Sequence, residues 1–188
     1  IGVDFVRIIS GSTPSPKLTN CVLVDDFTAA FKITNHLLEL GHTDIAFLCG
    51  DEEHSSSGER LAGFQAALTK RHIQANSKFI VPGSYSFESG VKGAKYLLDL
   101  PHPPTAIFAC NDEIAAGALF SARLAHIEIP QQLSIVGFEN SPFSRQTWPP
   151  LTTANQPNST IAMQAAELLF RHARPVGHTT QTEQQPVF

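Results

Sequence analysis

The sequence predicts an α/β fold built around a doubly wound parallel sheet. Short apolar runs alternate along the chain with longer segments whose apolar residues recur at helical spacing, and this alternation is typical of βαβ units. The apolar runs also lack polar alternation, as expected for strands that helices cover on both faces. With 188 residues, the chain is long enough for one large domain or two small lobes with a real core.

In the first half of the chain, the predicted strands and helices alternate in order. They occupy 21–24, 28–40, 45–49 and 60–71. Gly41 stands where a glycine ends a helix well, and Gly50 stops the second strand. The second helix carries Leu61, Phe64 and Leu68 on one face.

The second half continues the same alternation. The predicted elements are 79–81, 87–100, 106–109, 113–124, 133–138 and 160–171, with a last strand starting at Glu183. Ser86 can cap the helix that follows it, and the prolines of 101–104 end that helix. The three prolines of 148–157 indicate an extended crossover rather than an element.

Composition narrows the class of protein. Hydrophobic residues make up 42% and charged residues 16% of the chain, as in globular proteins rather than disordered ones. The net charge of −4 provides no basic face for nucleic acid, and no apolar run approaches the roughly 20 residues of a membrane helix. Three widely spaced cysteines in or beside apolar runs indicate buried reduced thiols and a reducing compartment: Cys21, Cys49 and Cys110.

Polar side chains follow four of the predicted strands, in segments 50–60, 83–86, 110–112 and 139–141. In open α/β sheets, ligands bind beyond the carboxyl ends of the strands. The carboxylates, amides, guanidinium and aromatic ring of these segments suit a polyol, a sugar or a nucleoside. The alternative is that they serve only as turn and cap residues, a role that favours Asn, Asp and Ser.

Signs of catalysis are weak. The chain holds no G-x-S-x-G elbow and no P-loop, and its eight histidines show no H-x-x-x-H spacing. We therefore predict no catalytic residue, no metal site and no cofactor. An α/β enzyme such as a sugar-processing hydrolase stays open as an alternative, since the acidic residues of 51–53 could serve acid–base chemistry.

From Val24 to Leu169, a set of short motifs stands in the order and spacing of one family. The motifs are Val24-Asp25-Asp26, His36-Leu37-Leu38 with Gly41-His42, Arg60-Leu-Ala-Gly-Phe64, Tyr85 with Ser89-Gly90, Pro104-Thr-Ala-Ile-Phe108 with Asn111-Asp112, Ser134-Ile-Val-Gly-Phe-Glu-Asn140, and Pro150-Leu-Thr-Thr153 with Gln156-Pro157. The chain thereby resembles the effector-binding core of LacI/GalR-type transcription regulators, truncated at both ends.

The resemblance implies a periplasmic binding protein-like fold of type I, with two lobes and the ligand between them. Residues 24–157 would form the C-terminal, effector-binding lobe. Residues 1–23 and 158–188 would belong to the N-terminal lobe, and the DNA-binding helix-turn-helix would lie outside this chain.

The resemblance also implies which residues contact the effector. By their places in the motifs or by spacing, they are Arg60, Tyr85, Asn111, Glu139, Gln156, His54 and Ser56. The family usually has Asp where this chain has Glu139, so the ligand would be smaller or differently placed, unless Glu139 faces solvent. Asp112 is expected to cap the following helix instead of contacting the ligand.

These expectations combine into one functional hypothesis. The chain would be the effector-sensing domain of a cytoplasmic DNA-binding transcriptional regulator, either a repressor or an activator, and it would bind a sugar-like or nucleoside-like molecule. It would form a homodimer, reach operator DNA through the missing headpiece, and have no membrane partner. The alternative is a periplasmic sugar-binding protein of a transport system.

Overall fold

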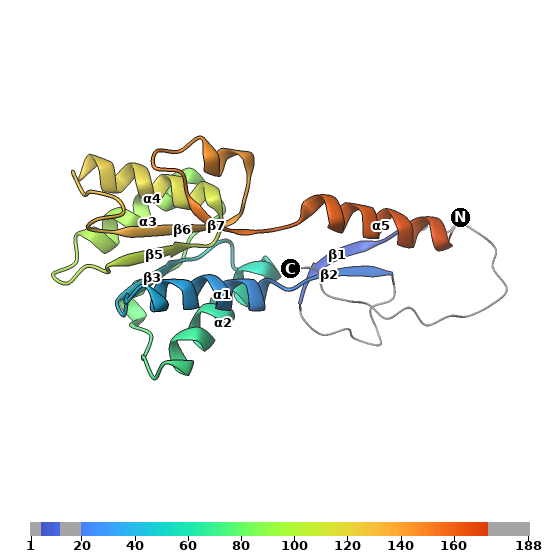
Figure 1. The fold of residues 1–188 in the computed structure, drawn as a ribbon, viewed down its shortest axis with the longest axis horizontal. Helices are drawn as coiled ribbons and strands as arrows, with labels where there is room; N and C mark the ends of the chain where they lie inside the picture. Colours follow the sequence, from blue (N-terminus) through green and yellow to red (C-terminus); the bar gives the residue numbers. More distant parts are fainter. Residues whose placement is uncertain (1–4, 12–19, 173–188) are drawn as a thin grey trace.

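The computed structural model describes residues 5–11 and 20–172 (Figure 1). Its larger sheet has five parallel strands in the order β4-β3-β5-β6-β7. The strands are β3 (Ile45–Leu48), β4 (Ile80–Val81), β5 (Ala106–Ala109), β6 (Ser134–Glu139) and β7 (Thr152–Asn155). The chain leaves β3 toward one edge and returns to its other side, so the sheet is doubly wound, as predicted.

Two pairs of helices cover the two faces of this sheet (Figure 1). Helices α1 (Asp26–Glu39) and α2 (Ser55–Lys70) pack together on one face, and α3 (Phe87–Leu98) and α4 (Asp112–Leu124) pack together on the other. The core between the first pair and the sheet centres on Phe47, whose ring lies 5.2 Å from that of Phe64 and 5.0 Å from that of Phe108. All three rings are fully buried.

A close approach of α3 and α4 depends on glycine. A Cβ on Gly117 would lie 2.1 Å from the Phe87 carbonyl oxygen, and one on Gly90 would lie 2.1 Å from the Ile114 carbonyl oxygen. No side chain fits at either distance, so the glycines let the two backbones touch.

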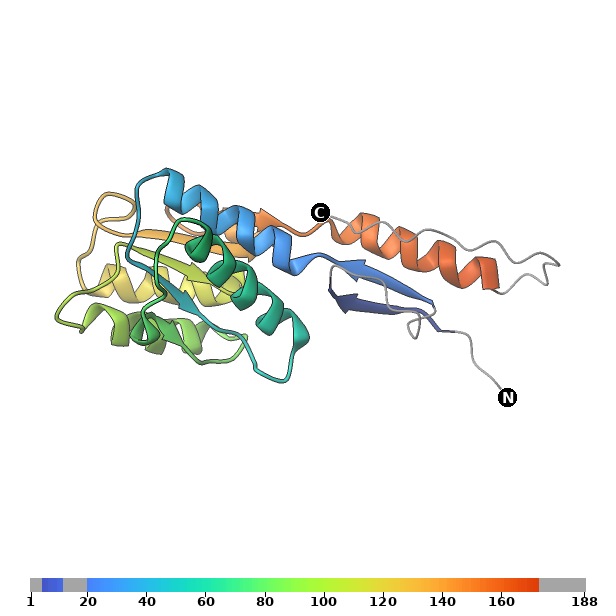
Figure 2. The same cartoon turned by 90° about the horizontal axis from the view of Figure 1, so that it is seen from below.

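A second, smaller sheet lies beyond the carboxyl ends of the larger one (Figure 2). It pairs β1 (Arg7–Ser10) with β2 (Cys21–Val24) in parallel. Helix α5 (Asn158–His172) packs on it and buries Ile161 against Val22 and Val24. The chain passes between the two parts at β2–α1 and again at β7–α5.

The structure corrects three predicted boundaries. Helix α2 begins at Ser55, five residues before the predicted start, so Arg60 lies in its second turn. Phe79 belongs to a short 3-10 helix, Ser77–Phe79, rather than to a strand. The segment 148–157 contains an element after all, because Thr152–Asn155 extends the sheet beside β6.

The remaining elements lie within one or two residues of their predicted bounds, and Ser86 caps α3 as expected by accepting the Ser89 backbone N–H. The strand predicted from Glu183 lies outside the described residues. Within the described ranges, no helix combines the length and apolarity needed to cross a membrane.

Candidate functional site

A cavity of about 550 Å³ lies between the two sheets, at the carboxyl ends of the larger one. Its walls come from β1 and β2, from α1, from the start of α2, from the end of β6, and from the segments after β4, β5 and β7. All seven residues predicted to contact an effector line it: His54, Ser56, Arg60, Tyr85, Asn111, Glu139 and Gln156. The topology thus brings together residues from five separate segments of sequence.

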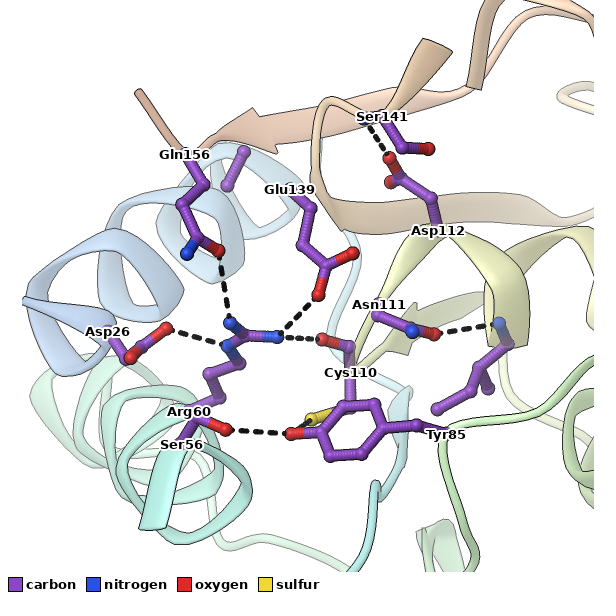
Figure 3. A network of polar contacts seen from close by, with 12 residues as sticks. Asp26, Ser56, Arg60, Tyr85, Cys110, Asn111, Asp112, Glu139, Ser141 and Gln156 are labelled. Carbon is purple, nitrogen blue, oxygen red and sulfur yellow. Dashed lines mark hydrogen bonds and ion pairs between the residues drawn. The ribbon is translucent and has the colours of Figure 1, made fainter. Parts of the chain in front are cut away.

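Arg60 lies at the centre of the polar network around this cavity (Figure 3). Its Nε donates to Asp26 Oδ1 at 2.8 Å, its Nη1 to the Cys110 carbonyl oxygen at 2.7 Å, and its Nη2 to Gln156 Oε1 at 3.4 Å. The guanidinium carbon lies 3.8 Å from the centre of the Phe138 ring. Such a set of partners fixes the position of the guanidinium before any ligand arrives.

Arg60 keeps its positive charge although it is buried, because Asp26 lies beside it. Only 4% of the Arg60 side chain and 3% of the Asp26 side chain are exposed. Burial alone would lower the pKa of Arg60, but the nearby Asp26 carboxylate and its hydrogen bond hold that pKa above its ordinary value. The two side chains therefore form a buried ion pair.

Sequence reasoning did not assign Asp26 to the site. Asp25, directly before it, caps α1 by accepting the Thr28 backbone N–H at 2.9 Å. That leaves the Asp26 carboxylate to accept from both Arg60 and the Ser10 hydroxyl of β1. The sequence did contain a signal for this role, because two acidic residues stand side by side at the start of a helix. Only one of two neighbouring side chains can cap the helix, so the other is available for a different partner.

Glu139 ends β6 and faces the cavity rather than open solvent. Its Oε1 lies 3.6 Å from Arg60 Nη1, and 35% of its side chain is exposed. Burial raises the pKa of Glu139, Arg60 opposes this shift, and the negative charge of Asp112 adds to it. Glu139 has a φ of 106° and Asn140 a φ of 51°, a region that residues with a side chain rarely adopt.

Asp112 holds this turn, and the prediction that it caps α4 is wrong. Asn111 caps the helix by accepting the Ile114 backbone N–H at 2.9 Å. The buried Asp112 carboxylate instead accepts the Ser141 backbone N–H at 2.7 Å and the Thr153 hydroxyl at 2.6 Å. The cap occupies the Asn111 oxygen and leaves its amide N–H groups for the cavity.

Thr153 links the strained turn to the neighbouring strand. Its hydroxyl oxygen accepts the Asn140 backbone N–H at 3.1 Å while donating to Asp112. Directly after β7, the Gln156 backbone N–H donates to the Glu139 carbonyl oxygen at 3.3 Å. The turn that presents Glu139 is therefore anchored to the crossover that leads to α5.

Tyr85 forms the aromatic wall of the cavity. Its hydroxyl lies 3.1 Å from Ser56 Oγ and 3.4 Å from Cys110 Sγ, and its ring meets the His54 ring edge-on at 5.5 Å. The ring packs against Gly50, where any Cβ would lie 2.3 Å from the ring carbon Cζ. Burial, with Cys110 adding to it, raises the pKa of Tyr85, so its hydroxyl stays a neutral donor.

All three cysteines are buried thiols outside any disulfide, as predicted. Burial, with smaller contributions from Cys110 and Glu52, raises the pKa of Cys49 to about 11. A thiol with so high a pKa is a poor nucleophile near neutral pH. Among residues 5–11 and 20–172, no group of three or more His, Cys, Asp and Glu side chains is arranged to hold a metal ion.

Comparison with known proteins shows which domain family has this fold. The profile of the periplasmic binding protein-like domain matches residues 34–187. The HTH-type transcriptional repressor CytR of Escherichia coli strain K12 is 41% identical over 149 residues, which cover 79% of this chain and 44% of the repressor. The chain thus spans about half the length of the curated relatives it matches.

Solved structures agree with the sequence match. A sugar-binding transcriptional regulator of the LacI family from Escherichia coli, complexed with phosphate, superposes with a TM-score of 0.85 at 26% identity, covering 95% of this chain and 64% of that one. The transcriptional regulator CelR, complexed with cellobiose, superposes with a TM-score of 0.83 at 26% identity, covering 96% and 55%. The chain therefore belongs to the periplasmic binding protein-like domain family and, within it, to the LacI-type transcription regulators.

Proposed function

We propose that this chain is the effector-binding core of a DNA-binding transcriptional repressor and that it senses a small, sugar-like or nucleoside-like molecule. The observation that carries this proposal is the cavity in which seven polar or aromatic side chains converge from five segments. Two comparisons support it: CytR is a transcriptional repressor, and the CelR structure contains cellobiose.

The cavity is placed to link ligand binding to a change of shape. Ile8, Ile9 and Ser10 line it from the smaller sheet, and Arg60, Tyr85 and Glu139 line it from the larger part. A ligand that contacts both parts favours the arrangement in which both sets of contacts form. We propose that the smaller sheet and α5 are part of an N-terminal lobe, 1–23 and 158–188, and that 24–157 form the C-terminal lobe.

Several finer features belong to the same proposal. The related proteins are transcription regulators rather than enzymes or transport proteins, so we assign this chain no catalytic activity and do not favour the transport alternative. Operator DNA would be bound by a headpiece outside these residues, in the cytoplasm. A net charge of −4 fits a domain that does not itself hold DNA.

A homodimer is the expected assembly. Phe87 and Phe120 lie with their rings 5.6 Å apart on the outer surface of α3 and α4, exposed by 38% and 45%, beside Leu124 at 66%. Exposed apolar clusters of this kind mark protein contacts. Sedimentation of the chain and of Phe120→Asp tests this proposal, and a monomer at all concentrations in both would contradict it.

The function is tested by titrating the chain with neutral sugars and nucleosides and following backbone amide NMR shifts, which also detect weak binding. We expect shifts at Tyr85, Asn111 and Glu139 and their loss in Glu139→Ala. Glu128→Ala, which removes an exposed carboxylate elsewhere, is the control. Shifts that survive in Glu139→Ala would exclude Glu139 from the binding site. No binding by any compound up to high millimolar concentration would refute the proposed function.

A further inference from the structure

The ionisable side chains around the cavity are unevenly balanced. Its lining holds three carboxylates, those of Asp26, Glu113 and Glu139, and a single guanidinium, that of Arg60. The other ionisable groups of the lining are the Tyr85 phenol and the exposed imidazole of His54. The cavity wall formed by the described residues therefore carries an excess of negative charge.

Arg60 is not available as an anion receptor. Proteins bind phosphate and carboxylate groups with two parallel N–H donors from one edge of a guanidinium. Here Nε donates to Asp26, Nη1 to the Cys110 carbonyl, and Nη2 to Gln156. The Nη1 nitrogen also lies 3.6 Å from Glu139 Oε1. No edge of the guanidinium therefore presents two uncommitted donors (Figure 3).

The positive charge of Arg60 is neutralised as well. Asp26 lies 2.8 Å away in a region that excludes solvent, where charges are poorly screened. An anion that displaced Gln156 or the Cys110 carbonyl would still experience the nearby Asp26 carboxylate. The guanidinium and Asp26 together contribute no net charge for a ligand to use.

The other two carboxylates face the cavity with acceptor capacity left over. Glu139 shares Arg60 with Asp26, and burial raises its pKa, which shows that its surroundings already disfavour negative charge. Glu113 accepts one backbone N–H, that of Phe87, at 3.2 Å. Ionised carboxylates accept hydrogen bonds and cannot donate them, so a ligand must bring its own donors.

We propose that this cavity selects an effector without negative charge that donates hydrogen bonds, through hydroxyl or amino groups, to Glu139 and Glu113. A neutral polyol, sugar or nucleoside binds, and its phosphorylated or carboxylated counterpart is excluded. This inference rests on the proposed function, since it concerns the ligand of the same cavity.

The test is a titration of this chain with matched pairs that differ only by an anionic group: glucose and glucose 6-phosphate, galactose and galacturonate, uridine and uridine 5′-monophosphate. Inorganic phosphate serves as the anion alone. For any pair that binds, we expect the neutral member to bind at least about tenfold more tightly, as one additional like charge a few ångströms away requires at intermediate dielectric.

A variant identifies the source of the selection. Glu139→Gln removes one charge from the cavity and keeps the shape of the side chain, so the preference for the neutral member should fall severalfold. Glu128→Gln removes an exposed charge far from the lining and should leave the preference unchanged.

The possible outcomes distinguish a failure of the charge selection from a failure of the proposed effector-binding function. An anionic member that binds as tightly as its neutral partner, or inorganic phosphate that binds the cavity, would overturn the charge selection and leave the effector-binding role standing. If no member of any pair binds, the proposed function fails, and this inference fails with it.

Discussion

Replacing Asp26 by Asn tests how far the buried ion pair with Arg60 supports the whole structure. The substitution keeps the size and the acceptor oxygen of the side chain and removes only its charge. It leaves a guanidinium that is 4% exposed with two neutral acceptors and with Glu139 at 3.6 Å. The structure therefore offers a partial but more distant replacement for the lost carboxylate.

The expected loss of stability is the cost of breaking the ion pair minus the part that the remaining partners of Arg60 offset. Removing one partner of a buried ion pair costs about 3–5 kcal/mol, because the other charge stays buried. Glu139 and the retained hydrogen bond to Asn offset part of this, so we expect a loss of about 2–4 kcal/mol in the free energy of unfolding. For a chain of this size, that corresponds to a fall in Tm of roughly 4–16 °C.

Urea denaturation followed by circular dichroism measures this loss, with an unchanged m-value as the sign that both states keep their extent of burial. The control is Glu88→Gln. Glu88 and Lys92 also lie 2.8 Å apart, but their side chains are 75% and 76% exposed, so that substitution should leave the midpoint unchanged. A loss below about 1 kcal/mol for Asp26→Asn would show that the Arg60 pair behaves like a surface pair and would refute the argument.

Three further predictions concern Glu139 and the helix contact at Gly117. In urea denaturation, the Glu139→Gly variant should be more stable than the Glu139→Ala variant by about 1 kcal/mol, because only glycine adopts a φ of 106° without strain. Equal stabilities of the two variants would mean that the turn is not strained. Burial raises the pKa of Glu139 above its ordinary 4.5. The stabilising contribution of the Glu139 carboxyl is therefore complete below pH 4.5 and is lost as the pH rises through the raised pKa. Glu139→Gln should therefore lose less stability than the parent chain as the pH rises from below 4.5 through the raised pKa, and parallel pH profiles would contradict the shift. Gly117→Ala should lower Tm by several degrees, because its Cβ would lie 2.1 Å from the Phe87 carbonyl and force the helices apart at a cost of about 1–3 kcal/mol; an unchanged Tm would show that α3 and α4 can separate freely.

Most of the fold could be predicted from the sequence because its strands are uniformly apolar and its helices have clear ends. Gly41, with a φ of 95°, and Ser86 stand where predicted, one after a helix and one before. The start of α2 was missed because three serines and a glycine, 55–58, favour caps and loops locally. Packing of the helix against the sheet overrides that preference.

Strand β7 was missed for a related reason. Its residues, Thr-Thr-Ala-Asn, carry little apolar signal, and prolines stand just before and after them. Only the neighbouring strand β6 makes the segment a strand, since pairing supplies its hydrogen bonds. Pairing between distant segments is not encoded in the local pattern.

The composition of the site could be predicted better than its internal contacts. The resemblance to a family identified seven residues that line one cavity, and their contact with an effector stays a prediction. It did not reveal the Asp26–Arg60 pair or the role of Asp112, because these depend on which of two adjacent side chains turns toward the backbone. The positive φ values at Glu139 and Asn140 could not be predicted from the sequence, because neither residue is a glycine.

The position of Arg60 affects how mutational scans of this chain should be interpreted. One guanidinium joins both passages between the two parts of the chain, through Asp26 and through Gln156. Substitutions there should therefore reduce the amount of folded protein in a cell as well as its response to a ligand. Substitutions of Glu139, which is partly exposed, should spare abundance and remove the response. A scan scored for abundance and response together would separate residues that assemble the cavity from residues that recognise its occupant.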